Sequence, residues 1–260
     1  MDMPSIQKHQ RSQGSVTLTV GRHGLIRMRE EGAAKVRLPY PEQAILINSG
    51  GGLAGGDGFQ TAITVESGAA LTVTGQAAER VYRSLGPPAT VQVMLTAAAQ
   101  AQLSWLPQET ILFDRAALTR SLTVALEADA RFLALEAIVF GRTEMAEAVR
   151  AVQFRERWRI SRAGQLIFAD GITVDGAVPR SPATLAAAQA MATLIYVAPD
   201  AEARLDRLRA AIAGKGGASA WNGKLIARVL APDGFELRKA LIPAIHALAG
   251  ASAVPKLWAM

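Results

Sequence analysis

Apolar and polar residues alternate along most of the first two thirds of the chain, in short runs that Gly, Pro or Asp residues separate. Such alternation places the apolar side chains on one face of a β-strand. The runs comprise residues 16–20, 63–65, 71–73, 91–95, 103–105, 122–126 and 133–135. They predict a long succession of short strands, and the two runs on either side of Gly68 have the pattern of a hairpin. No repeat of roughly 20 to 50 residues is visible, so the pattern favours neither a propeller nor a regular solenoid.

Helical patterns begin after residue 181. Residues 182–189 are rich in alanine and follow Ser181, a good helix cap, so we expect a helix there, and residues 191–197 either end it or form a strand. Asp200 is expected to cap a second helix, which Gly214 ends. The apolar stripe of this helix comprises Leu205, Leu208 and Ile212.

The last part of the chain contains a strong turn signal. Asn222-Gly223 favours a type I′ hairpin between two short strands. A final helix is expected from about Asp233, and Pro243 should kink it or shorten it, because proline cannot donate to the helix hydrogen bonds. Its apolar positions are Leu237, Leu241, Ile245 and Leu248.

By pattern alone, the chain is an α+β protein, mainly β with C-terminal helices. The β-rich part comprises residues 14–178, the mixed α/β part comprises residues 179–260, and residues 1–13 are expected to form a flexible tail. The chain has 260 residues, of which 50% are hydrophobic, so it can bury one large core or those of two smaller domains.

The composition also bears on the compartment. The chain has no cysteine, which excludes disulfides, thiol catalysis and Cys-based zinc sites and fits a reducing compartment. The N-terminus is polar, unlike a secretion signal, and apolar runs such as residues 132–140 and 191–198 are far shorter than the roughly 18 residues of a membrane-spanning helix. We therefore expect a cytoplasmic protein without a membrane partner.

The net charge of +6 is only partly concentrated in one segment. Arg155, Arg157 and Arg159 recur at every second position, so they share one face if the segment is a strand, and Arg162 follows them. The apolar residues beside them are Phe154, Trp158 and Ile160. That face is either simply solvated or a docking surface for an acidic protein or nucleic acid. Aromatic residues make up only 5% of the chain and no nucleic-acid motif is present, so no nucleic-acid partner is expected.

Residues suited to catalysis are sparse. His9, His23 and His246 do not have the spacing of metal ligands, and neither a Gly-x-Ser-x-Gly motif nor a cysteine nucleophile is present. A pair of carboxylates acting as in glycosidases remains open, because one sequence does not show which acids meet in space.

Several acidic residues have apolar neighbours or lie in predicted turns. Burying a carboxylate unpaired costs several kcal/mol, so each of them is hydrogen bonded, ion paired or functional. Four have an arginine nearby in the sequence and are expected to pair with one: Glu79, Glu109, Asp114 and Glu147. These arginines are Arg80, Arg83, Arg115 and Arg142. Three others have no basic residue beside them in sequence: Asp57, Glu136 and Asp170.

Residues 48–58, Asn-Ser-Gly-Gly-Gly-Leu-Ala-Gly-Gly-Asp-Gly, directly follow the apolar run 44–47. So many glycines indicate backbone conformations that other residues rarely adopt. Part of the segment matches G-x-G-x-x-G, but strand patterns follow it where a dinucleotide site needs a helix. A P-loop is also excluded, because no Gly-Lys-Ser/Thr is present.

Four blocks resemble, in the right order, the motifs of the urease accessory protein D family, also called UreD or UreH. The first is the glycine segment, similar to N-T-A/S-G-G-L-x-G-G-D with one residue more before the leucine. Residues 77–84, 106–114 and 141–147 resemble A-x-K-V/I-Y-R-S, L-P-x-E-x-I-x-F and G-R-x-A-M-G-E. The motif residues are Gly51, Gly52, Gly55, Gly56, Arg80, Tyr82, Arg83, Glu109, Gly141, Arg142 and Glu147. The chain departs from these motifs at Glu79-Arg80, where the family has a lone lysine, and at Glu144 and Ala146.

The resemblance implies a fold and a role. The implied fold has two layers of mixed β-sheet in a superhelix-like stack with a few C-terminal helices, as one domain over residues 14–260. The implied role is that of a non-enzymatic maturation factor: a scaffold that binds the urease apoprotein and recruits UreF and UreG for nickel insertion, with dimeric assembly through UreF.

The resemblance also assigns a role to three acids. In the family, acids at the positions of Asp57, Glu136 and Asp170 are thought to line an internal route for nickel. Carboxylates and water hold Ni²⁺ more weakly than imidazole and thiolate, as a route requires, so we expect transient Ni²⁺ and no tightly bound cofactor. Two alternatives remain open: a β-rich hydrolase with a carboxylate pair, and an interaction scaffold without any metal role.

Overall fold

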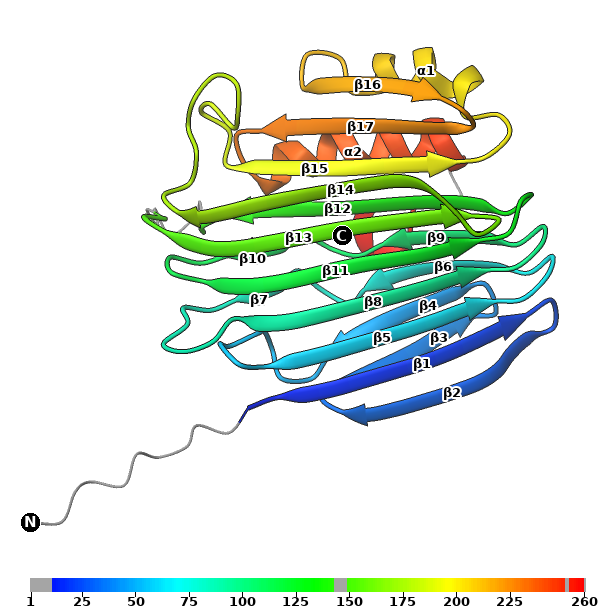
Figure 1. The fold of residues 1–260 in the computed structure, drawn as a ribbon, viewed down its shortest axis with the longest axis horizontal. Helices are drawn as coiled ribbons and strands as arrows, with labels where there is room; N and C mark the ends of the chain where they lie inside the picture. The colour runs from blue at the N-terminus through cyan, green and yellow to red at the C-terminus, as the bar shows by residue number, and fades with distance from the viewer. Residues whose placement is uncertain (1–10, 143–148, 251–252, 260) are drawn as a thin grey trace, which may run out of the picture.

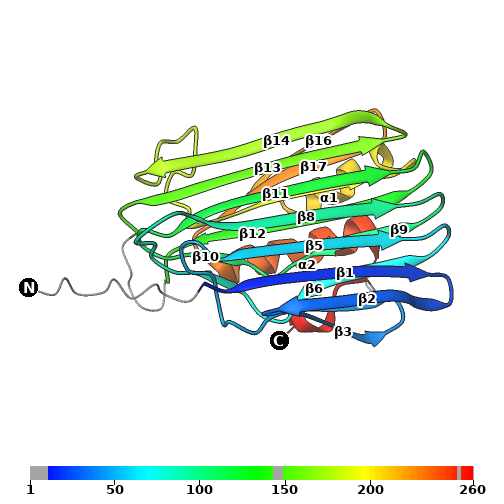
Figure 2. The same cartoon turned by 60° about the horizontal axis from the view of Figure 1, so that its bottom comes forward.

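The computed structural model describes residues 11–142, 149–250 and 253–259. They form three layers: a seven-stranded sheet, here sheet A; a ten-stranded sheet, here sheet B; and helices behind sheet B (Figure 1 and Figure 2). The fold is therefore mainly β with C-terminal helices, as the sequence and the family resemblance predicted. Of the expected tail, Gln13 already belongs to the first strand, and residues 1–10 lie outside the described residues.

Sheet A is the front layer in Figure 1. Its order is β14(Gln165–Gly176), β13(Val152–Arg162), β11(Ala117–Leu126), β8(Ala89–Ala97), β5(Gly58–Val65), β1(Gln13–Gly21) and β2(Gly24–Gly32). The five inner strands run parallel, and β14 and β2 close the two edges in the antiparallel sense. Apolar residues alternate in these strands because one face packs on sheet B and the other faces solvent.

Sheet B lies between sheet A and the helices. Its order is β16(Gly216–Trp221), β17(Lys224–Ala231), β15(Ala190–Val197), β12(Arg131–Phe140), β9(Gln102–Leu106), β6(Ala70–Gly75), β4(Gln43–Asn48) and β3(Ala34–Tyr40). Two short strands, β7(Glu79–Val81) and β10(Thr110–Leu112), add to it beside β12. Almost every residue of β12 and β15 is buried, because both faces of these strands are covered.

The chain coils between the two sheets, and this corrects two predictions. The strands on either side of Gly68 are not a hairpin, because β5 pairs in sheet A and β6 in sheet B. The coiling is solenoid-like although the sequence shows no repeat. Strands need only the period-two alternation to pack face to face, and that pattern does not fix coil length or residue identity.

Residues 182–189 do not form the predicted helix. They form turns in which the amides of Thr184 and Ala186 both donate to the Ser181 carbonyl, and Ala186 has a positive φ of 48°. Helix propensity is a weak preference that tertiary context overrides, and here the chain must turn before β15 begins at residue 190.

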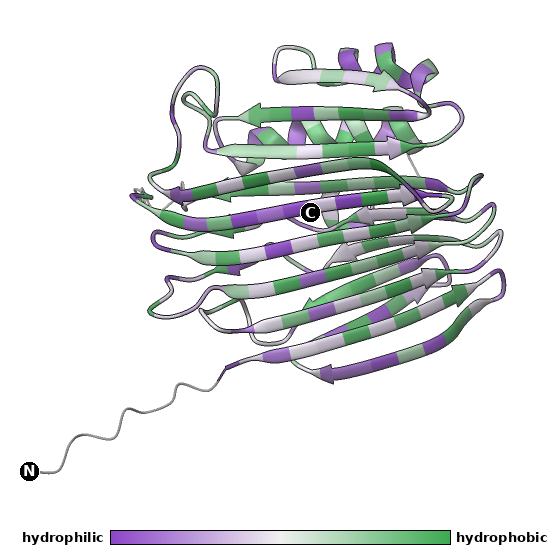
Figure 3. Cartoon of the chain, in the orientation of Figure 1, coloured by the Kyte–Doolittle hydropathy of each residue, from purple (hydrophilic) through white to green (hydrophobic). Residues whose placement is uncertain are grey.

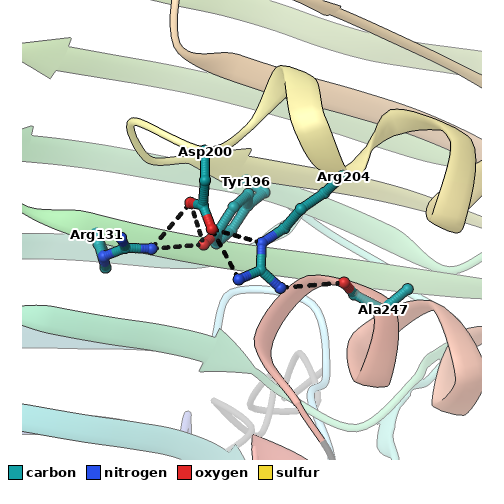
Figure 4. A network of polar contacts seen from close by, with 5 residues as sticks. All are labelled: Arg131, Tyr196, Asp200, Arg204 and Ala247. Atoms are coloured by element: carbon teal, nitrogen blue, oxygen red, sulfur yellow. Dashed lines mark hydrogen bonds and ion pairs between the residues drawn. The ribbon is translucent and has the colours of Figure 1, made fainter.

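Asp200 does not cap a helix. The short η2(Glu202–Arg204) precedes α1(Leu205–Ala211), and neither has a side-chain cap. Asp200 instead accepts hydrogen bonds from Arg131 at 2.9 Å, Tyr196 at 3.0 Å and Arg204 at 2.8 Å (Figure 4). The carboxylate thus joins the ends of β12 and β15 to the helical segment.

The predicted hairpin and last helix are confirmed. Asn222 and Gly223 have φ values of 51° and 71°, as a type I′ turn between β16 and β17 requires. Helix α2(Gly234–Ala249) begins after Asp233, whose side chain accepts from the Glu236 amide at 2.8 Å. The helix continues through Pro243, so the proline does not shorten it.

A buried polar layer as the candidate functional site

Hydrogen bonds to the Asp57 side chain fix the shape of the glycine segment. Asp57 accepts hydrogen bonds from the amides of Ala54 at 2.7 Å and Ser12 at 2.8 Å, and these contacts close the loop. Gly51, Gly52 and Gly56 have positive φ values of 74°, 146° and 85°. The segment is therefore a connector between the sheets, shaped by Asp57 and by glycines with positive φ.

The described parts of the four motif blocks meet at this connector. The Tyr82 hydroxyl donates to the Gly51 carbonyl at 2.9 Å, and the Tyr82 ring packs edge-on against Phe113 with centroids 5.3 Å apart. The guanidinium of Arg142 lies 4.4 Å from the centroid of the same Phe113 ring. Gly141, with a φ of 86°, donates to the Leu112 carbonyl at 2.8 Å. Contacts between neighbouring coils therefore link segments far apart in sequence.

A cavity of about 360 Å³ lies between the sheets next to this connector. Its walls come from inward-facing residues of both sheets, and the exposed residues Gly51, Gln76 and Arg80 are also part of its lining. Its polar lining includes Asn48, Glu79, Gln108, Thr110, Arg120 and Glu136.

At the inner end of the cavity, a polar layer crosses the core between the sheets. Glu136 on β12, Arg120 on β11 and Glu156 on β13 are all buried and point inward. On each strand the layer separates the same two apolar clusters. Phe154, Leu118 and Ile138 belong to one cluster, and Trp158, Leu122 and Ala134 belong to the other.

Arg120 holds this layer together. Its Nε donates to Glu156 Oε1 at 2.7 Å and its Nη1 donates to Thr110 Oγ1 at 2.8 Å. Nη1 also lies 2.7 Å from Glu136 Oε2, an ion-pair contact without hydrogen-bond geometry. The other Glu136 oxygen, Oε1, accepts from the indole Nε1 of Trp105 at 2.8 Å. One cation thus serves two buried carboxylates.

Burial changes the protonation of these groups. Desolvation raises the pKa of Glu136, which Arg120 opposes and Glu156 reinforces. Desolvation alone would lower the pKa of Arg120, but the charges of Glu136 and Glu156 outweigh it and raise that pKa, so the guanidinium stays charged. The layer therefore holds a fixed cation beside a carboxyl group that changes charge near neutral pH.

Glu79 connects the layer to the glycine connector. It lies on β7 beside Thr110, and it accepts from Asn48 Nδ2 at 3.2 Å. Desolvation raises the pKa of Glu79 to about 7, although the Asn48 hydrogen bond and the charge of Arg120 lower it. A chain of polar groups thus leads from the connector at Asn48 to the buried Glu156.

The structure separates the three acids that the family resemblance grouped. Glu136 lines the cavity and has a basic partner, Arg120, that sequence neighbours did not reveal. Asp57 lies in the connector outside the cavity lining, held by backbone amides. Asp170 lies on the edge strand β14, away from the cavity, and its carboxylate pairs with Arg228.

The expected pairs with neighbouring arginines are only partly present. Glu109 pairs with Arg238 of α2, because the fold places this helix behind sheet B. Arg238 Nη2 lies 2.6 Å from Glu109 Oε2. Asp114 lies 3.9 Å from Arg115. Arg83 is exposed and its backbone forms an isolated bridge with Ala116. Glu147 lies outside the described residues.

Arg120 and Glu156 were missed by the sequence reasoning, although a signal exists. Glu156 occupies the apolar phase of β13, in the series Phe154, Glu156, Trp158. Arg120 occupies the apolar phase of β11 in the same way. A charged residue in the inward phase of a strand indicates a buried partner, because a lone buried charge is too costly.

The buried carboxylates are not arranged as a free acid and base pair. The described residues include no group of three or more His, Cys, Asp or Glu residues placed to hold a metal ion tightly. Arg120 already occupies the space between the two innermost carboxylates, which a general acid and base would need for substrate.

Among the described helices, none is both long and apolar enough to cross a membrane.

The comparisons with known proteins agree with the resemblance. The model of the UreD urease accessory protein family matches residues 12–259. Urease accessory protein UreD of Agrobacterium fabrum is 45% identical over 264 residues, covering 98% of this chain and 93% of the relative. Those of Rhizobium johnstonii and Methylobacterium sp. are 46% and 42% identical, covering 92% and 98% of this chain and 90% and 97% of the relatives. The chain belongs to the UreD family of urease accessory proteins, which are maturation components and not enzymes.

Proposed function

We propose that the chain is a cytoplasmic scaffold in urease maturation that binds the urease apoprotein, recruits UreF and UreG, and passes Ni²⁺ through its interior. UreF would join two copies of the resulting complex. Family membership supports the accessory role and speaks against the alternative of a β-rich hydrolase.

The observation that carries the nickel part of the proposal is the polar layer at the end of the inter-sheet cavity. A sandwich core needs no buried carboxylates, and burying them costs several kcal/mol unless they are paired. Here Glu79 and Glu136 both line the cavity, and burial raises the pKa of each. A carboxyl group that loses its proton near neutral pH can exchange that proton for a metal ion.

The chemistry of the lining fits a transient cargo. Carboxylate, amide and hydroxyl oxygens bind Ni²⁺ more weakly than imidazole or thiolate. Among the described residues that line the cavity, Glu79, Glu136, Gln108 and Thr110 offer oxygens, and none is a histidine or cysteine. Ni²⁺ that enters is therefore held loosely enough to leave.

The two other candidate acids lie outside the cavity lining, so the proposal gives them smaller effects on nickel passage. Asp57 shapes the connector beside the cavity, so its effect on nickel passage would act through the loop. Asp170 lies at the edge of sheet A and is tied to Arg228. We therefore rank Glu136 first, Asp57 second and Asp170 last in their expected effects.

The test is urease activation in cells that co-express the urease operon with variants of this chain at limiting nickel. Glu136→Gln keeps the size of the side chain and its bond to Trp105 and removes the charge, so activation should fall severalfold. Asp57→Asn and Asp170→Asn follow in the stated order. Glu66→Gln, in an exposed turn, is the matched control and should activate like the wild type.

Co-purification separates the two parts of the proposal. The wild type and Glu136→Gln should both retain UreF, UreG and the urease apoprotein, because Glu136 is buried and its substitution leaves the protein surface unchanged. If Glu136→Gln binds all partners and activates urease fully, the chain is a scaffold without a metal role. If the wild type does not bind the partners, the scaffold role itself is wrong.

A further inference from the structure

The outer face of sheet A is made mostly of small polar residues. Outward positions on β5, β8 and β11 are occupied largely by Thr, Ser, Ala and Gln. No described helix covers this face, since the helices lie behind sheet B (Figure 2). Such a face offers hydroxyl groups and room for another backbone but little apolar surface.

A row of three arginines crosses this face along β13. Arg155, Arg157 and Arg159 are exposed and alternate with the buried Phe154, Glu156, Trp158 and Ile160. Figure 3 shows the middle of β13 as mainly purple. Alternate residues of a strand are about 6.6 Å apart, so three guanidinium groups stand in line at that spacing.

The neighbours of the row carry no charge. On β11 the three arginines lie opposite Thr119, Ser121 and Thr123. On β14 they lie opposite Thr173, Gly171 and Ala169. Asp170 lies opposite Trp158, in the inward phase of β14, and pairs with Arg228, so the nearest acid on the outward face is Asp175, opposite Gln153 at the end of the row. Within the described part of the chain, none of the three arginines forms an ion pair.

Two other arginines of the sheets have acidic partners. Arg29, on the opposite edge of the same face, lies 2.5 Å from Glu31, and Arg228 pairs with Asp170. On the inner side of β13, Glu156 forms an ion pair with Arg120. Three like charges left side by side repel one another, and an acidic partner relieves that repulsion.

We propose that Arg155, Arg157 and Arg159 form a docking site for an acidic protein segment that lies extended along β13, with carboxylates at alternate positions. An extended segment matches the arginine spacing, because its own alternate side chains also repeat at about 6.6 Å. Guanidinium groups bind carboxylates in a bidentate manner, and the small residues on β11 and β14 let the partner backbone approach. The face has no outward aromatic residue beside the row on which a nucleic-acid base would stack.

The test uses the full chain and a fluorescent peptide in which Glu and Thr alternate, with binding followed by anisotropy at increasing salt. We expect the triple variant R155Q/R157Q/R159Q to weaken binding by about tenfold, because exposed ion pairs are individually weak but add along the row. The affinity of the wild type should fall steeply with salt. A peptide with the same composition but all glutamates in one block should bind more weakly than the alternating one.

Two controls make the result specific. The variant R22Q/R27Q/R207Q loses the same charge at scattered exposed sites and should bind the alternating peptide like the wild type. All variants are compared by circular dichroism, and the outward positions of the substitutions should leave the melt unchanged. Equal binding by both triple variants overturns the proposal. Tighter binding of a single-stranded oligonucleotide than of the peptide also overturns it, because the row would then serve nucleic acid.

Discussion

Gly55 has no room for a side chain. A Cβ atom there would lie 2.0 Å from Ser84 Oγ and 2.8 Å from the Pro87 carbonyl oxygen. We expect Gly55→Val to lower the free energy of unfolding by about 1–3 kcal/mol, measured by urea denaturation, because the connector must shift to make room. Gly217→Val is the control, since Gly217 has open space around its Cβ position. Equal losses in both variants would show that the connector is not specially constrained.

The carboxyl group of Glu79 makes stability depend on pH. Its pKa is about 7 in the folded state and 4.5 in a free chain, so between these values the folded state binds a proton that the unfolded state has lost. Stability from this group is complete below about pH 4.5 and is lost as the pH rises through about 7. We expect Glu79→Gln to gain about 1–3 kcal/mol relative to the wild type between pH 5 and pH 8, measured by urea denaturation. An unchanged difference between the variants across this range would contradict the assignment.

At the scale of the strands, the polar layer depends on Arg120. Removing one partner of a buried ion pair leaves an uncompensated charge, which costs about 3–5 kcal/mol. We expect Arg120→Met to lose that much at pH 8 and clearly less at pH 5, where the raised pKa of Glu136 lets the carboxyl group become neutral. Chemical denaturation at the two pH values measures the difference.

A second variant separates charge from packing in that layer. Adding Glu136→Gln and Glu156→Gln to Arg120→Met removes all three charges, so most of the loss at pH 8 should be recovered. If stability is not recovered, side-chain packing and not charge pairing stabilises the layer. The exposed Arg207→Met is the matched control and should change stability little at either pH.

The strand content and the C-terminal hairpin were predictable because they depend on local signals. Period-two alternation marks β1, β5 and β8 directly, and Asn222-Gly223 can adopt the two positive φ values of a type I′ turn. The pairing of strands was not predictable. Alternation states that a strand has an apolar face but not which sheet supplies the partner, so the apparent hairpin at Gly68 is in fact a crossover.

The site was predictable in its parts and not in its geometry. The motif blocks and Glu136 stand out in the sequence, but the partner of Glu136 is Arg120 on a neighbouring coil of the chain. The same holds for Glu109, whose partner Arg238 follows far along the chain. Long-range ion pairs depend on how coils and helices align in space, and that alignment cannot be read from local patterns in one sequence.

At the scale of the whole molecule, the C-terminal segment joins the layers. Trp258 is 1% exposed, and its indole Nε1 donates to the Leu106 carbonyl at 3.2 Å and to Thr74 Oγ1 at 3.3 Å, both in sheet B. The Arg238 guanidinium, on α2, lies 5.6 Å from the centroid of the Trp258 ring. The end of the chain thus closes the apolar layer between sheet B and α2 and borders the residues that line the cavity.

Trp258→Ala should therefore affect more than its own neighbourhood. Truncating a buried tryptophan costs about 3–5 kcal/mol, and here it also leaves the Leu106 carbonyl and Thr74 with one partner fewer. Trp221→Ala removes the same side chain at a site that is 42% exposed, on the edge strand β16, and should cost less than about 1 kcal/mol. Urea denaturation followed by circular dichroism measures both variants without relying on tryptophan emission. Equal losses of stability in the two variants would mean that the C-terminal segment contributes no more than a surface contact. A large loss for Trp258→Ala alone means that sheet B and α2 share one cooperative core that the C-terminal segment completes.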